Sequence, residues 1–242
     1  MRSISRIITN RTLNLPDVNF SEGEIILVDK PSGPTSFQIV NKIRKIIDVK
    51  KVGHSGTLDP KASGLMIICT GKKTKVMDSF INLNKTYSGV IRLGLTSASM
   101  DTETECIETP IPEDLDEKKI LEARDSFIGE IEQTPPMFSA VKINGKKLYN
   151  LARKGKSVER EPRKIFIERF DITKIDLPDI HFIITCSKGT FIRVIADDFG
   201  EKLNTGAVLI ELRRIGIGNF RIEDAITIDV FSNNFQLSAA AK

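Results

Sequence analysis

The sequence predicts an α+β, or mixed α/β, fold, and three observations favour it. Predicted strands and helices alternate irregularly along the chain. Several strands follow one another closely enough to pair with near neighbours, which favours a mixed sheet over a parallel doubly wound one. The 242 residues, 40% hydrophobic and 28% charged, are typical of a globular protein with a substantial core.

Three helices are predicted from apolar residues at helical spacing. Residues 36–47 carry apolar side chains at 39, 40, 43, 46 and 47, and Thr35 or Ser36 is expected as the N-cap. Residues 113–128 form an acidic amphipathic pattern, with Leu115, Ile120, Leu121 and Phe127 as its apolar stripe. Residues 192–203 form the third helical pattern and end at a glycine-containing turn.

The rest of the chain is expected to contain a helical continuation, a surface extension and several extended segments. Residues 207–215 continue the pattern of the preceding helix, and residues 216–228 are expected as short extended pieces. Residues 1–22 are polar and weakly patterned, which predicts an extension lying on the surface. Strands are predicted over residues 24–30, 65–69, 86–94, 163–175 and 179–187.

Asp59 is the most constrained carboxylate of the chain. It lies in the stretch Gly53-His54-Ser55-Gly56-Thr57-Leu58-Asp59-Pro60. Two glycines allow a tight loop, and Pro60 restricts the Asp59 backbone to extended conformations. Because a buried strand follows, we expect a rigid loop at the edge of a sheet, which suits a reactive carboxylate. An Asp-Pro turn that caps local backbone groups is the alternative at this point.

Several classes of protein are not supported by the composition. No apolar run approaches the roughly 18 residues that span a bilayer, and residues 1–10 lack a signal-peptide core, so a cytoplasmic protein without a membrane segment is expected. The three cysteines are far apart and the histidines number two, which argues against a disulfide framework or a metal cluster. Near matches to a nucleophile elbow, a P-loop and a dinucleotide fingerprint all fail. A site without cofactor or metal, built around one aspartate, is predicted.

Charge is distributed unevenly along the chain. Residues 142–164 contain nine Lys or Arg against Glu159 and Glu161, a local charge of +7, whereas the whole chain carries +4. Residues 101–132 contain twelve acids and three bases. The basic segment indicates either a surface that follows phosphates or a solvated lysine-rich loop, and composition alone does not separate the two.

Five ordered motifs resemble the TruB-type pseudouridine synthases. The first is the Asp59 loop with Val52 before it and Ala62-Ser63-Gly64 after it. The others are Val28-Asp29-Lys30-Pro31; Lys85-Thr86-Tyr87 with Leu93-Gly94 and Asp101; Pro135 to Lys142 with Gly145 to Tyr149 and Ala152-Arg153; and Cys186 to Arg193 with Asp198, Gly200 and Leu212-Arg213-Arg214. The resemblance runs from about Gly23 to about Asp229.

The resemblance implies a pseudouridine synthase fold with a central, mostly antiparallel mixed sheet flanked by helices and loops. It implies a catalytic domain over residues 23–232, preceded by the extension 1–22, with a basic RNA-binding insertion over about 136–164. Residues 233–242 are then a short tail, too little for the complete C-terminal PUA domain that bacterial members usually carry.

The implied reaction converts a uridine in the T-arm loop of tRNA to pseudouridine. Asp59 matches the catalytic aspartate, acting as nucleophile or as base. Arg193 matches the arginine that pairs with it, and a charge-assisted pair would keep the carboxylate ionised. Tyr87 matches the tyrosine that stacks on the target base. The reaction implies no cofactor and no metal.

The remaining site residues also follow from the resemblance. His54 matches the residue that fills the space left by the flipped base. Phe191, where the family usually carries Tyr, and Leu212 match the lining of the uracil pocket. Lys30 and Pro31 match residues that support the catalytic loop. The insertion is expected to be mobile until RNA binds, and its RNA-contacting residues are expected to include Lys142, Lys146, Lys147 and Arg153.

Two other functions stay open beside a stand-alone tRNA enzyme, which is expected to be a monomer. One is the catalytic subunit of a guide-RNA-directed pseudouridine synthase, whose members share the Asp59 loop motif. The other is a non-catalytic RNA-binding or RNA-folding module. The intact set Asp59, Tyr87 and Arg193 argues against the last, because a binding module does not need all three.

Overall fold

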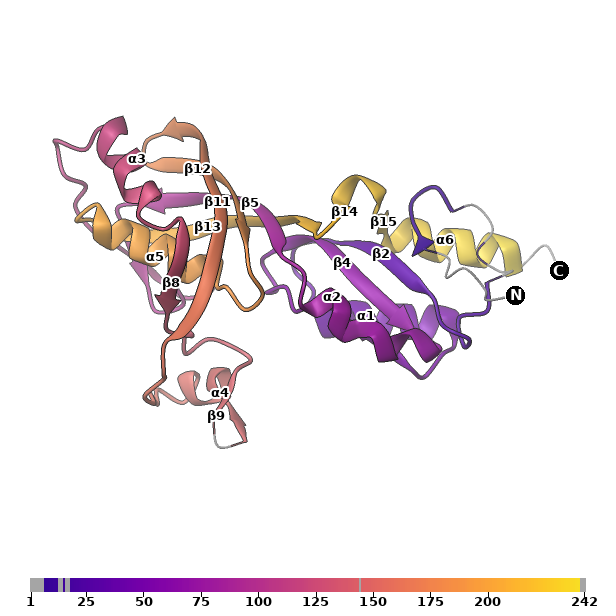
Figure 1. Ribbon diagram of the computed structural model, residues 1–242. Coiled ribbons are helices and arrows are strands. Elements are labelled where there is room, and N and C mark those ends of the chain that lie inside the picture. Colours follow the sequence, from indigo (N-terminus) through magenta and orange to yellow (C-terminus); the bar gives the residue numbers. More distant parts are fainter. Residues whose placement is uncertain (1–6, 13–14, 16–17, 144, 240–242) are drawn as a thin grey trace. The chain divides into compact units, whose positions relative to one another are not determined.

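The chain divides into two units in the computed structural model, which describes residues 7–12, 15, 18–143 and 145–239. Unit 1 combines Met1–Tyr87 with Arg213–Lys242, and unit 2 is Ser88–Leu212 (Figure 1). Strands β5 (Lys85–Leu93) and β13 (Ala207–Ile217) run through the division. Each unit is therefore described by itself.

Unit 1 is built on strands in the order β1-β2-β4-β13, with β3 paired to β4, β14 to β13 and β15 to β2. The strands β2 and β4 are antiparallel, whereas β4 and β13 are parallel. Its other elements are β1 (Ile7–Ile8), β2 (Ile25–Lys30), α1 (Ser36–Ile47), β3 (Val52–His54), β4 (Ser63–Thr70), the 3-10 helix η2 (Gly71–Val76), α2 (Met77–Ile81), β14 (Phe220–Arg221), the 3-10 helix η3 (Ile222–Asp224), β15 (Ile226–Thr227) and α6 (Ile228–Ala239).

Helix α1 begins where the sequence predicts. Thr35 is the N-cap, and its side chain and that of Gln38 form a reciprocal capping box that satisfies two backbone N–H groups. The apolar residues at 39, 40, 43 and 47 are buried, and the helix lies beside β3 and contacts α6. Asp48 ends it in the left-handed conformation, φ 49°.

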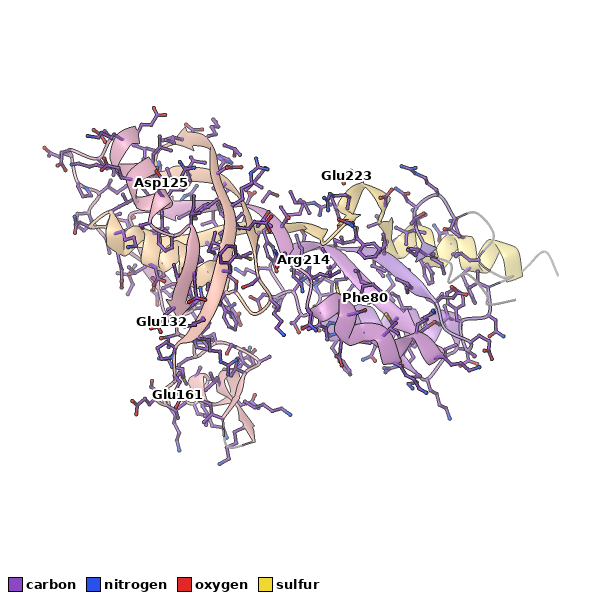
Figure 2. The ribbon with its side chains drawn as sticks, viewed as in Figure 1. Phe80, Asp125, Glu132, Glu161, Arg214 and Glu223 are labelled. Atoms are coloured by element: carbon purple, nitrogen blue, oxygen red, sulfur yellow. The ribbon has the colours of Figure 1, made fainter. Side chains whose placement is uncertain are left out.

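The core of unit 1 lies where β2 and β4 face α2 and the segment after β13. Ile25, Leu27, Leu65 and Ile67 are buried there, and the Phe80 ring, labelled in Figure 2, packs edge-on 5.7 Å from that of Phe220, a pair that closes this side of the core.

The prediction that residues 1–22 lie on the surface is wrong for the residues that the structure describes. Ile7–Ile8 pairs with β2 as a parallel strand. Ile8 and Leu15 are fully buried, and Phe20 is nearly so. Residues 1–6, 13–14 and 16–17 lie outside the described part. Three apolar side chains of this segment pack into the core of unit 1. They are too widely spaced in the sequence to show a helical or strand period, so the sequence did not reveal them.

Unit 2 is built on the strand order β13-β5-β12-β11-β8. The long pair β11 and β12 is antiparallel, as is the pair β11 and β8. Together with unit 1, these pairings confirm the predicted mixed, mostly antiparallel sheet. Its other elements are β6 (Leu95–Ser97), β7 (Cys106–Glu108), α3 (Glu117–Asp125), β8 (Gly129–Gln133), β9 (Lys142–Ile143), β10 (Lys146–Lys147), α4 (Leu148–Ala152), β11 (Arg163–Asp176), β12 (Asp179–Cys186) and α5 (Ile192–Lys202).

A cluster of phenylalanines fills the space between the unit 2 sheet and its helices. The Phe170 ring lies 6.2 Å from Phe127, 5.8 Å from Phe182 and 6.1 Å from Phe199. Phe127 follows α3, Phe199 belongs to α5, and the other two point from β11 and β12. Helices α3 and α5 are thereby fixed against one face of the sheet (Figure 1).

Two predicted helical segments differ from the structure. The helix predicted over 113–128 is shorter, Glu117–Asp125, because Asp116 acts as N-cap and accepts a hydrogen bond from the Lys119 backbone N–H at 2.8 Å. Residues 207–215 do not continue the helical pattern but belong to strand β13. Residues 207–209 of that strand are all buried and Glu211, Arg213 and Arg214 interrupt its second half, so its sequence shows no regular alternation of apolar and polar residues.

Candidate active site

Lys30 holds the loop that carries Asp59 through hydrogen bonds to its backbone. This side chain is fully buried at the end of β2. Its Nζ donates hydrogen bonds to the carbonyls of Pro31 at 3.0 Å, Pro60 at 3.2 Å and Ala62 at 2.5 Å. One ammonium therefore ties the end of β2 to the segment that follows Asp59.

Opposing effects act on the pKa of Lys30 in this position. Burial lowers the pKa of its ammonium to about 8, although the nearby Asp59 carboxylate raises that pKa, and Arg214 lowers it. Lys30 and Asp59 thus interact electrostatically as well as through the backbone. The protonated lysine favours an ionised Asp59, which is the form that a nucleophile or a general base requires.

The start of α1 forms the second brace. The Ser36 hydroxyl accepts a hydrogen bond from the Leu58 backbone N–H at 2.8 Å and donates one to the Leu58 carbonyl at 3.0 Å. The Gly33 N–H donates to the Pro60 carbonyl at 2.8 Å. Because Ser36 is buried, these bonds exclude water and fix the residues on both sides of Asp59.

Arg214 is the third brace, and sequence reasoning assigned it no role. Its side chain is almost completely buried on β13, where it appears in Figure 2. Nε donates to the Leu65 carbonyl at 2.7 Å and Nη2 to the Gly56 carbonyl at 3.3 Å. The guanidinium therefore links the loop to β4 and β13. Its place in the Leu212-Arg213-Arg214 motif was the signal that could have revealed it.

The close approach of the Arg214 backbone to strand β4 depends on a glycine. Gly64 has φ +110°, and a Cβ there would lie 2.3 Å from the Arg214 carbonyl oxygen. Both the backbone conformation and the space exclude a side chain. The glycine of the Ala62-Ser63-Gly64 motif is thus explained by the parallel pairing of β4 with β13, in which Gly64 lies opposite Arg214.

His54 lies at the end of β3 and is half-buried. Its Nδ1 accepts a hydrogen bond from the Gly56 N–H at 3.3 Å. Burial lowers the pKa of its imidazole, and the nearby Arg214 charge lowers that pKa as well. The ring is therefore neutral near pH 7, which suits the predicted stacking on bases rather than a contact to phosphate.

Tyr87 is placed on β5 with its side chain mostly buried. Two residues earlier, the buried Lys85 donates hydrogen bonds to the carbonyls of Ile81 at 2.6 Å and Leu83 at 2.7 Å. This lysine satisfies carbonyls at the end of α2 and so fixes the start of β5. The Lys-Thr-Tyr motif thus combines an anchoring lysine with the tyrosine that the resemblance assigns to the base.

Arg193 belongs to unit 2, at the start of α5, and is buried. Its Nη2 donates to the Phe138 carbonyl at 2.5 Å, and its Nη1 lies 3.5 Å from Asp101 Oδ2. Asp101, which the motif comparison included without a role, accepts further bonds from Ser99 and the Glu103 backbone. Asp101 therefore orients the arginine. The pairing of Arg193 with Asp59, which lies in unit 1, stays a prediction.

Phe191 and Leu212 are also placed in unit 2, both half-buried. The Gln133 side chain accepts a hydrogen bond from the Phe191 N–H at 2.8 Å and donates one to its carbonyl at 3.1 Å. The Arg193 guanidinium lies 5.8 Å from the Phe191 ring. The buried Gln133 thus fixes the residue that precedes α5, a contribution that sequence reasoning missed.

The basic insertion extends from the ends of β8 and β11 in unit 2 (Figure 1). Its described part contains the hairpin of β9 and β10 and the short helix α4, with Leu148 fully buried. Lys142, Lys146 and Arg153 are exposed, and the Arg153 guanidinium lies 4.3 Å from the Tyr149 ring. The side chain of Lys147 lies outside the described part.

A cavity of about 530 Å³ lies in unit 1, lined by Asp29, Arg213 and Pro31 together with residues of α1 and of the start of α6. Arg213 forms a bidentate ion pair with Asp29, at 2.7 and 3.1 Å. Asp59 does not line it. In the described ranges, no helix is long and apolar enough to cross a membrane, and no three or more His, Cys, Asp or Glu gather as potential metal ligands.

Solved structures show the same architecture. A structure titled "Crystal Structure of a Cbf5-Nop10-Gar1 Complex" matches 97% of this chain with a TM-score of 0.71 and 28% sequence identity. One titled "Crystal structure of the archaeal box H/ACA sRNP Nop10-Cbf5 complex" matches 92% with a TM-score of 0.67 and 26% identity. The chain spans 64% and 56% of the length of those two proteins.

Curated relatives are more similar in sequence. A protein of Chlorobaculum tepidum named tRNA pseudouridine synthase B is 49% identical over 90% of this chain and 93% of its own length. A protein of the same name from Flavobacterium johnsoniae is 45% identical over 90% of this chain and 98% of its own.

Family profiles cover most of the chain. Residues 44–192 match the TruB family pseudouridylate synthase (N terminal domain), and residues 193–240 match the tRNA pseudouridylate synthase B C-terminal domain. The chain therefore belongs to the TruB family of pseudouridylate synthases, and the resemblance drawn from its motifs is confirmed.

Proposed function

We propose that this protein isomerises a uridine in the T-arm loop of tRNA to pseudouridine, with Asp59 as the catalytic carboxylate. The observation that carries the proposal is the loop itself, in which Lys30, Ser36 and Arg214 hold the residues around one carboxylate. The near-full-length similarity to proteins named tRNA pseudouridine synthase B supports the choice of substrate. We further propose that it acts as a monomer in the cytoplasm.

The reaction balances without a second reactant. The bond between uracil N1 and ribose C1′ breaks, the uracil rotates, and a bond forms between C5 and C1′. The proton at C5 is lost and N1 gains one. Asp59 acts either as the nucleophile at the sugar or as the base that removes a sugar proton. In both routes the carboxylate must be ionised, and the nearby Lys30 ammonium favours that form.

The remaining residues are proposed to receive and hold the flipped base. The neutral His54 ring fills the space that the uridine leaves, since flipped bases are replaced and received by stacking surfaces. Tyr87 stacks on the uracil, and Phe191 and Leu212 line its pocket. Arg193, oriented by Asp101, pairs with Asp59 when the substrate is bound.

A direct assay tests the reaction, the catalytic residue and the need for a guide together. The protein alone is incubated with an unmodified T-arm stem-loop, and pseudouridine is detected by selective chemical labelling. We expect product from the wild type and none from Asp59→Asn. Asp48→Asn is the matched control, because the same substitution is made at an exposed helix C-cap where asparagine tolerates φ 49°.

The guide-directed alternative has one observation in its favour, namely the fold shared with structures titled as H/ACA complexes. Activity of the isolated protein without guide RNA contradicts that alternative. Activity that appears only when guide RNA is added supports it. No product from either mixture, with RNA binding intact, supports the non-catalytic RNA-binding module.

The basic insertion is proposed to grip the T-arm. Lys142 and Lys146 are exposed on a two-stranded hairpin, which is followed by a helix of five residues, and elements this short are marginal on their own. We expect limited trypsin digestion to cut within residues 142–164 in the free protein and to be slowed by T-arm RNA. Equal cleavage with and without RNA contradicts this ordering.

A further inference from the structure

Phe37 is an aromatic side chain that the fold leaves in solvent. It is 63% exposed, although it lies in the first turn of α1, whose other face is buried in unit 1. Single exposed apolar residues are common, so exposure alone indicates no function. The position of Phe37 relative to the Asp59 loop gives it significance.

Phe37 directly follows the residue that anchors that loop. Its preceding neighbour, Ser36, holds both backbone groups of Leu58, the residue before Asp59. Residues 37, 41 and 44 share one face of α1, since they are four and three positions apart. The Arg44 guanidinium donates to Asn41 Oδ1 at 2.7 Å and to the Val52 carbonyl at 3.2 Å. The face that carries Phe37 therefore contacts the start of this segment at Val52, and the residue next to Phe37 binds its other end at Leu58.

The stretch of chain that contains Phe37 carries a net positive charge. From residue 31 to residue 62 the chain carries six Lys or Arg against Asp48 and Asp59, a local charge of +4. All five lysines on this stretch are exposed, and so is Thr57 in the loop itself; the lysines are Lys42, Lys45, Lys50, Lys51 and Lys61. An aromatic ring among cations is the combination by which proteins bind unpaired nucleotides, because the cations attract phosphates and the ring stacks on a base.

We propose that Phe37 stacks on an unpaired nucleobase of the RNA substrate next to the uridine on which Asp59 acts. This inference rests on the proposed function and adds a substrate-binding contact to it. Phe37 holds the flanking nucleotide against α1 while the target uridine is out of the stack. The contact contributes to binding rather than to bond rearrangement, so it is expected to act on KM and not on kcat.

The chain offers a direct spectroscopic test, because it contains no tryptophan. The variant Phe37→Trp therefore reports from a single indole. Stacking of a base on that indole is expected to quench its fluorescence when T-arm RNA binds. Ile107→Trp is the matched control, since Ile107 is 65% exposed and lies on β7, in the acidic part of unit 2. Its emission is expected to stay unchanged.

Binding and kinetics provide the second test. Phe37→Ala is expected to raise the Kd for the stem-loop, and its KM, by about 5- to 150-fold, with kcat at saturating RNA unchanged. Phe37→Tyr keeps a ring of the same shape and is expected to retain wild-type affinity. Ile107→Ala is expected to have no effect. A wild-type KM for Phe37→Ala, or an unquenched indole in an RNA-bound Phe37→Trp, overturns the inference.

The outcomes separate this inference from the proposed function. RNA that quenches the indole but yields no pseudouridine with the wild type refutes the proposed reaction and leaves the stacking contact standing. Pseudouridine formed by Phe37→Ala with wild-type KM refutes the contact alone. Emission that changes with protein concentration in the absence of RNA assigns Phe37 to an interface between copies of this chain and also overturns the inference.

Discussion

At the scale of single residues, two buried cations define the geometry of the Asp59 loop. Lys30 and Arg214 are both nearly inaccessible, and each binds backbone carbonyls rather than forming a simple ion pair. Buried charges are costly unless their hydrogen bonds are satisfied, so both depend on an undistorted loop. A change in the loop conformation would leave these two charges without their hydrogen bonds, and this cost keeps the loop rigid.

Lys30 gives the site a pH dependence. Its pKa of about 8 means that the ammonium loses its proton above that pH, and with it the favourable field at Asp59. We expect kcat to fall above about pH 8 in the wild type. In Lys30→Met the activity should be lower throughout and lack this limb. Single-turnover rates between pH 6.5 and 9.5 measure both.

Stability should change in the opposite direction over the same range. Between pH 8 and 10.5 the unfolded chain holds a proton that folded Lys30 has released, so the free energy of unfolding contributed by this group rises with pH. A fall in kcat without loss of folded protein therefore points to Lys30. The same alkaline limb in Lys30→Met contradicts the assignment.

At the scale of elements, the start of α1 has two neighbouring hydroxyl residues with different tasks. Thr35 caps the helix through the Gln38 backbone N–H, whereas Ser36 binds the Asp59 loop at Leu58. Thr35 therefore stabilises the helix, and Ser36 positions the loop. Their adjacent positions make them a matched pair for separating stability from activity.

We expect Thr35→Ala to lower the free energy of unfolding by about 1 kcal/mol and to leave kcat unchanged. Ser36→Ala removes two buried hydrogen bonds and should cost about 2 kcal/mol, and it should also lower kcat because Leu58 and Asp59 are no longer held. Urea denaturation and single-turnover assays measure the two effects. Equal kcat values for the two variants would contradict a bracing role for Ser36.

Helix α5 carries a destabilising pair of acids. Burial, together with the charge of Glu201, raises the pKa of Asp197 to about 6, and burial, Asp197 and Glu201 together raise that of Asp198 to about 6. Because the folded state holds protons that the unfolded state releases between pH 3.8 and 6, these groups reduce stability as pH rises through that window.

Asp198→Asn is accordingly expected to raise Tm at pH 7.5, and the gain should disappear near pH 4. Glu105→Gln, a change at an exposed acid of unit 2, serves as the control and should leave Tm unchanged at both pH values. Thermal unfolding at the two pH values measures the difference. A gain that persists at pH 4 would show that packing, and not charge, separates Asp198→Asn from the wild type.

At this scale the sequence predicts most elements, and the exceptions have physical reasons. Helix α1 is evident because its apolar period and its cap agree. Strand β13 is not, because burial leaves no alternation, and Ile8 and Phe20 are buried through contacts that no local pattern reveals. At the candidate site, the loop sequence is enough to propose Asp59, but Arg214 binds the Leu65 carbonyl 149 positions away, and only the pairing of β4 with β13 brings the two close.

At the scale of the whole molecule, charge is separated along the chain. The insertion, residues 142–164, carries +7 in a protein of net charge +4, and residues 101–132 are strongly acidic. Basic residues thus gather in a segment that extends from unit 2, while the acids surround α3. Such a separation favours one orientation of a polyanion and keeps it away from the acidic part.

The salt dependence of RNA binding should reveal how much of the affinity comes from the insertion. Each lysine or arginine that contacts a phosphate releases counterions, so the logarithm of the binding constant falls with the logarithm of salt by about 0.7 to 0.9 per contact. We expect simultaneous replacement of Lys142, Lys146, Lys147 and Arg153 by alanine to reduce that slope by about 3.

Filter-binding titrations of T-arm RNA between 50 and about 300 mM KCl measure the slope, a range over which screening of exposed charges changes strongly. A control variant removes four exposed lysines elsewhere in unit 2, at positions 118, 119, 174 and 202. Its slope should match the wild type, because these positions lie outside the insertion. An equal reduction of the slope in both variants would mean that RNA binding depends only on the total charge of the protein. An unchanged slope in the insertion variant would mean that these four residues do not contact RNA phosphates.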